Sequence, residues 1–247
     1  MISDIYTIWL REMLRTFRAR SRIISSLAMP FFWLVFIGVG IGSSFSLPGM
    51  NYISFLSPGI IGMILLFNSM FSSLSVIWDR QFGFLKEILV APVSRTSIVL
   101  GKTLGGATMA IVTAFIMLLL EIVLGFVNPS FGIVFAFVFM ILTAVCFVSI
   151  GLIIASRMES MEGFQMIMSF LIMPVFFLSG ALFPLQNTPA WMQFASHFDP
   201  LTYGVDGLRG SMIGTSIYPL WIDFTVLSAI TLFFIFMGSY MFSKSVR

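Results

Sequence analysis

The stretch FGIVFAFVFMILTAVCFVSIGLIIA, residues 131–155, runs for 25 residues without a charged side chain. An α-helix of about 20 apolar residues crosses the ~30 Å hydrocarbon core of a bilayer, so this stretch predicts a membrane-spanning helix. Five further apolar runs of span length flank it, at residues 23–42, 55–78, 104–126, 164–183 and 221–242. The sequence therefore predicts an all-α polytopic membrane protein with six transmembrane helices, whose termini lie on the same side of the membrane.

The composition excludes an ordinary soluble protein. Hydrophobic residues make up 59% of the chain and charged residues 9%, and the mean hydropathy is +1.06. A soluble domain needs more polar surface than this composition supplies. The net charge of +3 does not indicate nucleic-acid binding, because the basic residues are dispersed between the apolar runs.

Basic residues lie almost entirely on one side of the six predicted spans. Of the 13 Lys and Arg residues, only Arg209 falls on the other side. Cytoplasmic loops carry an excess of Lys and Arg, so this distribution predicts an inner-membrane protein with both termini in the cytoplasm. The loops predicted to be cytoplasmic are 79–103 and 156–163. The segments predicted to face outward are 43–54, 127–130 and 184–220.

Residues 1–22 have two different faces if they form a helix. Apolar residues recur every four positions, and arginines line another face: Ile5, Trp9, Met13 and Phe17 against Arg11, Arg15, Arg18 and Arg22. This pattern predicts an amphipathic helix in the cytoplasmic membrane interface. The alternative is that the arginines serve only to orient the first span.

The 79–103 loop contains a second amphipathic pattern. Apolar residues recur at helical spacing around Lys86 and Glu87, namely Phe84, Leu85, Ile88 and Leu89. A short helix with this face ends before Pro92, because the residue preceding a proline is displaced from the helical region. Such a helix is able to dock in a groove of a soluble partner. The alternative is a solvated loop between two spans.

The sequence contains no site for ATP hydrolysis or other catalysis that we recognise. Gly101-Lys102-Thr103 resembles the end of a phosphate-binding loop, but Thr96 replaces the required earlier glycine and no strand precedes it. The single histidine and the single cysteine, Cys146, offer no metal cluster or disulfide framework. We expect no enzyme activity and no cofactor in this chain, so that any energy from ATP must come from another polypeptide.

Residues 184–220 are too apolar for a solvated loop, since aromatic and aliphatic residues alternate with four prolines. Two short helices at the outer leaflet, at about 190–198 and 203–213, explain this composition. Asp206 and Arg209 stand three residues apart, close enough to pair on one helical face.

Glu121 is the one clear ionisable residue in the middle of a predicted span. A charge there is costly, so the side chain is protonated, paired with a neighbouring span or directed into a polar cavity. We name it as a candidate intramembrane polar site, with a structural hydrogen bond and a role in substrate transport or gating as the alternatives.

Three stretches together resemble a known family, the membrane permeases of type-2 ABC transporters, and in particular its exporters of drugs, antibiotics and lipo-oligosaccharides. The first two are FLSGALFP at residues 177–184 and DPLTYGVDGLRG at residues 199–210, and the third includes Arg80, Gly83, Leu85, Pro92 and Arg95. The resemblance covers nearly the whole chain, so that residues 1–247 are expected to form a single transmembrane domain. Gln81 and Asp199 depart from the family pattern, which often has glutamate and asparagine there.

The resemblance implies a permease that pairs with a second copy or a paralogue and binds two cytoplasmic ATPase subunits, which hold ATP and Mg²⁺. It implies a coupling helix to the ATPase at Gly83, Phe84, Leu85, Lys86, Glu87, Ile88, Leu89 and Pro92. It also implies re-entrant outer helices between spans five and six, with a signature at Ser179, Gly180, Pro184, Pro200, Asp206 and Arg209.

The apolar spans, rich in Phe and Met, favour a hydrophobic or amphipathic substrate. An ATP-independent secondary transporter or channel is the main alternative. Such proteins usually need several intramembrane charges, whereas this chain has one clear candidate. A membrane scaffold or an integral enzyme is less well supported, because no catalytic constellation is present.

Overall fold

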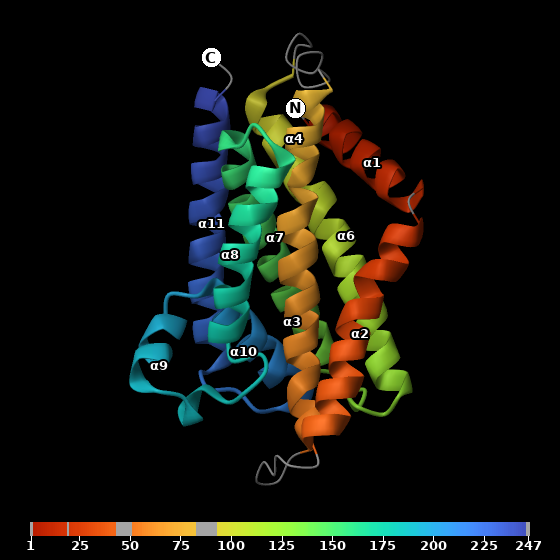
Figure 1. Cartoon of the computed structure of the whole chain (residues 1–247), viewed down its shortest axis with the longest axis vertical. Coiled ribbons are helices and arrows are strands. Elements are labelled where there is room, and N and C mark those ends of the chain that lie inside the picture. The colour runs from red at the N-terminus through yellow and green to blue at the C-terminus, as the bar shows by residue number, and fades with distance from the viewer. Residues whose placement is uncertain (1, 19, 43–50, 83–92, 246–247) are drawn as a thin grey trace.

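Helices form every regular element in the part of the chain that the structure describes. The computed structural model describes residues 2–18, 20–42, 51–82 and 93–245. In chain order its elements are α1 (Ile2–Arg18), α2 (Arg20–Gly42), α3 (Tyr52–Ser72), α4 (Leu74–Gln81), α6 (Arg95–Val123), α7 (Ile133–Arg157), α8 (Met161–Leu178), the 3₁₀ helix η1 (Leu185–Asn187), α9 (Ala190–Ser196), α10 (Pro200–Ile213) and α11 (Leu220–Ser245). The all-α class is confirmed for these residues (Figure 1).

Five helical stretches in the described part of the chain are long and apolar enough to cross a membrane. They are Tyr52–Gln81, Arg95–Val123, Ile133–Arg157, Met161–Leu178 and Leu220–Met241. The run predicted as the first span forms a shorter apolar stretch, Ile24–Gly40, within α2. At 1.5 Å per residue this stretch is about 25 Å long, slightly less than the hydrocarbon thickness. The polytopic architecture is confirmed, and the sixth span stays a prediction.

Three predicted spans differ from the structure in where their helices begin, end or divide. The span predicted over 164–183 ends earlier, because α8 ends at Leu178 with Ser179 as its C-cap. The run predicted over 55–78 is divided at Ser73, where α3 ends and α4 begins. The helix predicted to begin at 104 begins at Arg95, because the Ser94 hydroxyl accepts a hydrogen bond from the Ser97 N–H (3.1 Å) and caps it. α4 therefore extends past the end of its apolar run, and α6 begins before the start of its own. Both extensions carry charged residues.

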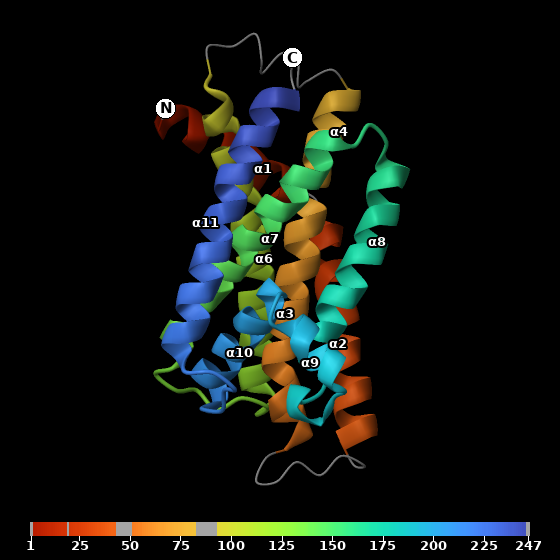
Figure 2. The ribbon, with the colours of Figure 1, turned by 90° about the vertical axis from the view of Figure 1, so that its left-hand side faces the viewer.

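The two ends of the bundle differ in their charged residues. α1, the end of α4, the start of α6 and the end of α11 lie at the upper end in Figure 1, and α9, α10 and the α6–α7 connection lie at the lower end in Figures 1 and 2. Arg80, Arg95 and Arg157 stand at or near helix ends of the upper part, and Arg209 lies in α10. This division agrees with the charge distribution along the sequence. Which end faces the cytoplasm stays a prediction.

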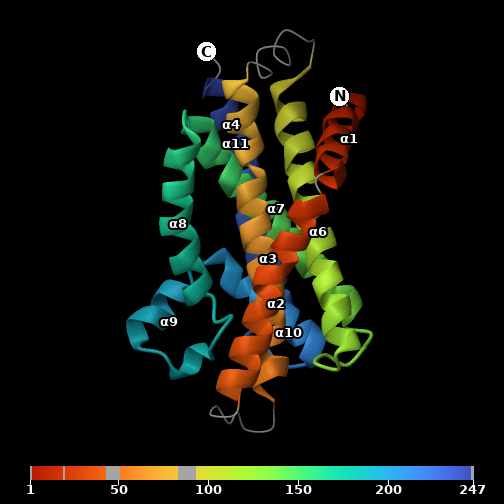
Figure 3. The same ribbon diagram turned by 45° about the vertical axis from the view of Figure 1, so that its right-hand side comes forward.

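α7 is the central helix, in contact with α3, α6, α10 and α11. α8 stands at the edge, as Figure 3 shows. Its buried residues form one stripe at Phe164, Met168, Ile172 and Phe176. The four positions are spaced by four residues, so α8 contacts the bundle through a single face.

α10 lies inside the bundle, with every residue from Leu201 to Met212 buried except Gly210. A Cβ atom at Gly207 would overlap the Phe139 ring, and one at Gly204 would lie 2.5 Å from Thr143 Oγ1. The glycines thus allow α10 to approach α7. The helix predicted over 203–213 is therefore present but begins at Pro200, and the helix predicted over 190–198 corresponds to α9.

Candidate functional site

Glycines on α6 allow α1 to pack closely against it. A Cβ atom at Gly101 would lie 2.7 Å from Ile8 Cβ, and one at Gly105 would lie 2.8 Å from Glu12 Cβ. Trp9 Nε1 also donates a hydrogen bond to Thr108 Oγ1 on α6 (3.1 Å). The Gly-Lys-Thr stretch at 101–103 is helical, and Gly101 in it serves helix packing.

The buried face of α1 differs from the predicted apolar face. Ile8, Glu12 and Met13 are buried, whereas Phe17 is 52% exposed. The buried face differs because α1 packs on α6, where the Glu12 side chain contacts the buried Lys102. A second, exposed apolar stripe lies at Ile2, Tyr6, Leu10, Leu14 and Phe17. This stripe keeps α1 suited to the membrane interface.

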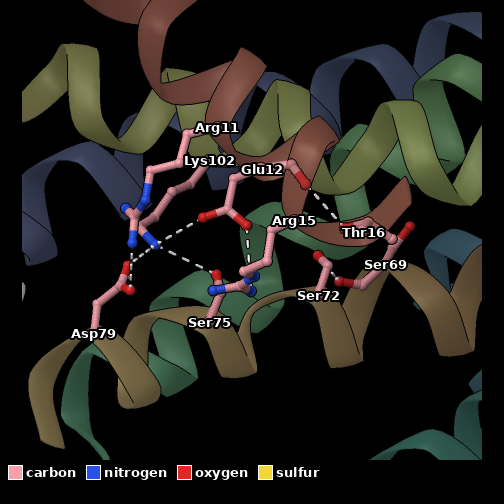
Figure 4. Close-up of polar contacts among 9 residues, drawn as sticks. All are labelled: Arg11, Glu12, Arg15, Thr16, Ser69, Ser72, Ser75, Asp79 and Lys102. Atoms are coloured by element: carbon pink, nitrogen blue, oxygen red, sulfur yellow. Dashed lines mark hydrogen bonds and ion pairs between the residues drawn. The ribbon is translucent and has the colours of Figure 1, made fainter. Parts of the chain in front are cut away.

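Three buried charged side chains meet where α1, α4 and α6 adjoin (Figure 4). Lys102 Nζ lies 2.5 Å from Asp79 Oδ2 and 3.4 Å from Glu12 Oε1, and it donates a hydrogen bond to Ser75 Oγ (3.3 Å). Each of the three charged side chains is less than 10% exposed. Because an isolated buried ion is very costly, the charges are tolerated here only through their mutual contacts.

Two arginines complete this charge cluster on its more exposed side. Arg11 Nη2 lies 3.1 Å from Asp79 Oδ1, and Arg15 Nη2 lies 3.3 Å from Glu12 Oε2. Their side chains are 35% and 41% exposed. We call these five residues, Arg11, Glu12, Arg15, Asp79 and Lys102, the charge cluster. With three cations and two carboxylates, it carries a formal charge of +1.

Arg80 joins the end of α4 to the α7–α8 connection. Its Nη1 and Nη2 donate hydrogen bonds to the carbonyl oxygens of Met158 and Ser156, both at 2.9 Å. Gln81 Nε2 donates to the carbonyl oxygen of Glu159 (3.2 Å). The end of α4 is therefore held to α1 and α6 through Asp79 and to the α7–α8 connection through Arg80.

The predicted coupling helix follows α4 directly and lies outside the described residues, which exclude 83–92. All of the predicted coupling residues, from Gly83 to Pro92, fall in this range. Its described neighbours are Phe82, which is 73% exposed, and Val93 and Ser94 before α6. Two members of the charge cluster lie on the helices that bound this segment, Asp79 on α4 and Lys102 on α6, and the other three lie on α1.

At the other end of the bundle, Arg209 of the predicted outer signature contacts residues near the end of α8 and in α3. It is 5% exposed, its Nη2 donates to the carbonyl oxygen of Gly180 (2.9 Å), and its guanidinium lies 4.0 Å from the centre of the Phe55 ring. Gly180 has a φ of +71°, a conformation that favours glycine, and follows Ser179, the C-cap of α8. Ser179, Gly180 and Arg209 thus connect α8, α10 and α3.

Asp206 and Arg209 take separate hydrogen-bond partners, contrary to the pairing that their spacing suggests. Asp206 Oδ2 accepts hydrogen bonds from the N–H groups of Ile217 (2.8 Å) and Tyr218 (2.9 Å), which closes the α10–α11 connection. Pro184 is the N-cap residue of η1, and Pro200 is the first residue of α10. Asp199 caps α10 by accepting from the Leu201 N–H (2.9 Å), a role that asparagine also performs.

Glu121 is fully buried in α6. Neither of its carboxylate oxygens has a hydrogen-bond partner among the described residues. The sequence had suggested a structural hydrogen bond as one role for Glu121. Glu121 forms no such bond with the described residues. In the same part, no three His, Cys, Asp or Glu residues are grouped so that they could hold a metal ion.

Sequence reasoning missed the charge cluster. It assigned the arginines of α1 to the interface and placed Asp79 and Lys102 in a cytoplasmic loop, while Glu12 had no role. A signal was present, because Asp79 and Lys102 carry opposite charges and stand close to the facing ends of two consecutive apolar runs. The position of Glu12 opposite them depends on the docking of α1, which the sequence did not reveal.

Comparisons with known proteins agree with this architecture. The family described as "ABC-2 type transporter" matches residues 3–213. The chain is 29% identical over 213 residues to a protein of Cyanophora paradoxa named "Putative transport permease ycf38". The matched region covers 84% of this chain and 73% of that protein. It is 28% identical over 229 residues to the inner membrane transport permease YadH of Escherichia coli K12 (90% and 87% covered). It is 26% identical over 224 residues to nodulation protein J of Rhizobium leguminosarum bv. viciae (89% and 86% covered). The family match extends from α1 to the end of α10, so it includes the charge cluster and the Arg209 region.

Proposed function

The chain belongs to the ABC-2 type transporter family, whose members are membrane permeases without an ATPase domain, and we propose that it is the permease subunit of an ATP-driven exporter. In this proposal two cytoplasmic ABC ATPase subunits bind ATP and Mg²⁺ and supply the energy. A second permease, identical or paralogous, completes the translocation path. The cargo is a hydrophobic or amphipathic molecule such as a drug, a lipid or a glycolipid.

The observation that best supports ATP-driven action is that the charge cluster joins the two helices that precede and follow the predicted coupling segment in the chain. Residues 83–92 are bounded by α4 and α6, and Lys102 of α6 contacts Asp79 of α4. Lys102 also contacts Glu12 of α1. In our proposal a displacement of the coupling segment by the ATPase therefore moves α4, α6 and α1 together.

The short connection between α1 and α2 extends this route into the membrane. α1 ends at Arg18 and α2 begins at Arg20, so a tilt of α1 passes directly to the apolar Ile24–Gly40 stretch of α2. On the other side, Arg80 passes the motion of α4 to the α7–α8 connection. The mechanism that we propose is a concerted shift of these helices, which opens a path between the two permeases toward the outer face.

We place the second permease against the exposed face of α8. Opposite its single buried stripe, this helix exposes Met166 (63%) and Phe170 (80%). Met side chains adapt to varied apolar shapes, so the same face is suited to both a partner helix and an amphipathic cargo. Packing two α8 helices across a twofold axis would place the translocation path between the subunits.

The test is reconstitution of the permease with an ABC ATPase from the same genome. We expect the two to co-purify and to export a fluorescent amphiphile from liposomes during ATP hydrolysis. The control is the same complex with the phosphate-binding lysine of the ATPase changed to alanine, which should stop transport. Transport that continues with the inactive ATPase would instead indicate a secondary transporter or a channel.

A further inference from the structure

A cavity of about 330 Å³ adjoins the charge cluster, between α1, α2, α3, α4 and α6. Arg15 and Lys102 line it, together with Asn68 and Ser72 of α3 and Thr113, deeper in α6. Figure 4 shows Arg15 extending from α1 toward Ser75, across the part of the bundle where Ser72 also lies. Its wall also includes the apolar side chains of Phe71, Leu74 and Met109. The cavity therefore combines charged, uncharged polar and apolar surfaces.

The polar lining favours an anionic, acceptor-rich ligand. Arg15, a cation of the charge cluster, lines the cavity, and its side chain is 41% exposed. Asn68 Nδ2 is a buried donor without a hydrogen-bond partner among the described residues. Leaving a buried donor unsatisfied costs free energy, and a negatively charged oxygen would both accept its hydrogen bond and pair with Arg15.

The size of the cavity favours a headgroup over a whole lipid. Its volume lies near the lower end of the range for small-ligand sites, about 300–1,000 Å³. The apolar side chains on its wall are suited to the first carbons of an acyl chain, which would continue along the helices.

We propose that this cavity binds the phosphate-bearing headgroup of an amphiphile from the membrane leaflet next to α1. Arg15 and Asn68 donate hydrogen bonds to the phosphate oxygens, and Lys102 supplies positive charge behind them. The proposal concerns binding by the permease alone, so it goes beyond the proposed function and does not depend on the ATPase.

The experiment is native mass spectrometry of the full-length permease in detergent, titrated with lipids that share the same acyl chains. We expect phosphatidylglycerol to bind about tenfold more tightly than glucosyl-diacylglycerol, which has no phosphate, because hydrogen bonds to charged groups are the stronger ones. Asn68→Leu and Arg15→Gln should each lower the affinity for phosphatidylglycerol about tenfold.

The matched control is Arg18→Gln, on the same helix but exposed and outside the cavity lining. It should change the affinity by less than about twofold, because an exposed charge interacts weakly. Arg15 is partly exposed, so its variant should fold even if the Asn68 variant does not. Equal binding of the two lipids, or an equal loss in Arg18→Gln and Arg15→Gln, would overturn the proposal.

A third ligand identifies the source of the phosphate. Free glycerol 3-phosphate that displaces phosphatidylglycerol from the wild-type protein, and fails to bind Arg15→Gln, would show that a soluble phosphate suffices. Failure of free glycerol 3-phosphate to compete would show that the acyl chains are needed and that the ligand is a lipid. Both results are consistent with a phosphate-binding site in the cavity, and they differ only in which molecule supplies the phosphate.

Discussion

Lys102 is a buried cation that contacts carboxylates on two other helices. We predict that Lys102→Met destabilises the protein, because the buried carboxylates of Glu12 and Asp79 then lose their contact with the lysine ammonium. Removing one partner of a buried ion pair typically costs about 3–5 kcal/mol, and we expect about 3 kcal/mol here since Arg11 and Arg15 still contact the carboxylates. The free energy of unfolding in detergent, followed with denaturant, measures this loss.

The control for Lys102→Met is the double variant with Asp79→Asn. This second change removes one of the two carboxylates that lose their contact with Lys102, so roughly half of the lost stability should return. A Lys102→Met variant with the stability of the wild type would contradict the structural importance of the cluster.

Glu121 is a buried carboxyl group without a hydrogen-bond partner among the described residues. Ionisable residues inside a membrane usually serve transport or gating, so we predict that Glu121→Gln folds and assembles normally but transports more slowly, by about fivefold or more. Transport and ATP hydrolysis are measured in the same liposomes. Wild-type transport by this variant would leave Glu121 as a residue that only fills the interior of the bundle.

At the scale of elements, the segment between α4 and α6 carries the predicted contact with the ATPase. We predict that Leu85→Asp combined with Leu89→Asp detaches the ATPase while the permease stays in the membrane. Burial of each leucine contributes about 1.5–3 kcal/mol, so the loss of both weakens binding by about 100-fold or more. Co-purification from membranes measures the binding.

Glu87→Ala provides the comparison for this pair of substitutions, since it removes a polar contact and keeps both leucines. It should lower substrate-stimulated ATP hydrolysis more than it lowers co-purification. If the double-Asp variant retains both properties, the segment is only a connecting loop.

α8 is the element that we place against the second permease. A single cysteine at Phe170, in a Cys146→Ser background, should form a disulfide between two copies on oxidation, because residues near a twofold axis meet their own copies. Phe236→Cys on α11, where the native side chain is 73% exposed, is the matched control and should stay monomeric. Equal cross-linking at both positions would remove the support for an interface at α8.

At the scale of the whole molecule, the predicted orientation is testable because exposed positions lie at both ends. Asn187 in η1 and Ser94 before α6 are both exposed. Single cysteines there, again with Cys146→Ser, should behave differently in intact cells: an impermeant thiol reagent should label position 187 and not position 94. Labelling of position 94 from outside would reverse the orientation.

The sequence by itself determined the class of protein, most of its span positions and its family. Hydropathy and charge bias are properties of consecutive residues, so they survive without knowledge of the fold. The sequence also contains the residues that cap two helices, Ser94 before α6 and Asp199 before α10. The apolar runs alone placed the starts of these helices several residues too late.

Only the tertiary structure decided which polar residues meet. Sequence spacing suggested a pair between Asp206 and Arg209, yet the fold directs Arg209 to Gly180 and Asp206 to the α10–α11 connection. Lys102 reaches Glu12 because glycines on α6 let α1 approach, a contact between residues 90 positions apart. Such contacts depend on how helices pack against one another, and the free energy of a buried charge depends on the partners that this packing supplies.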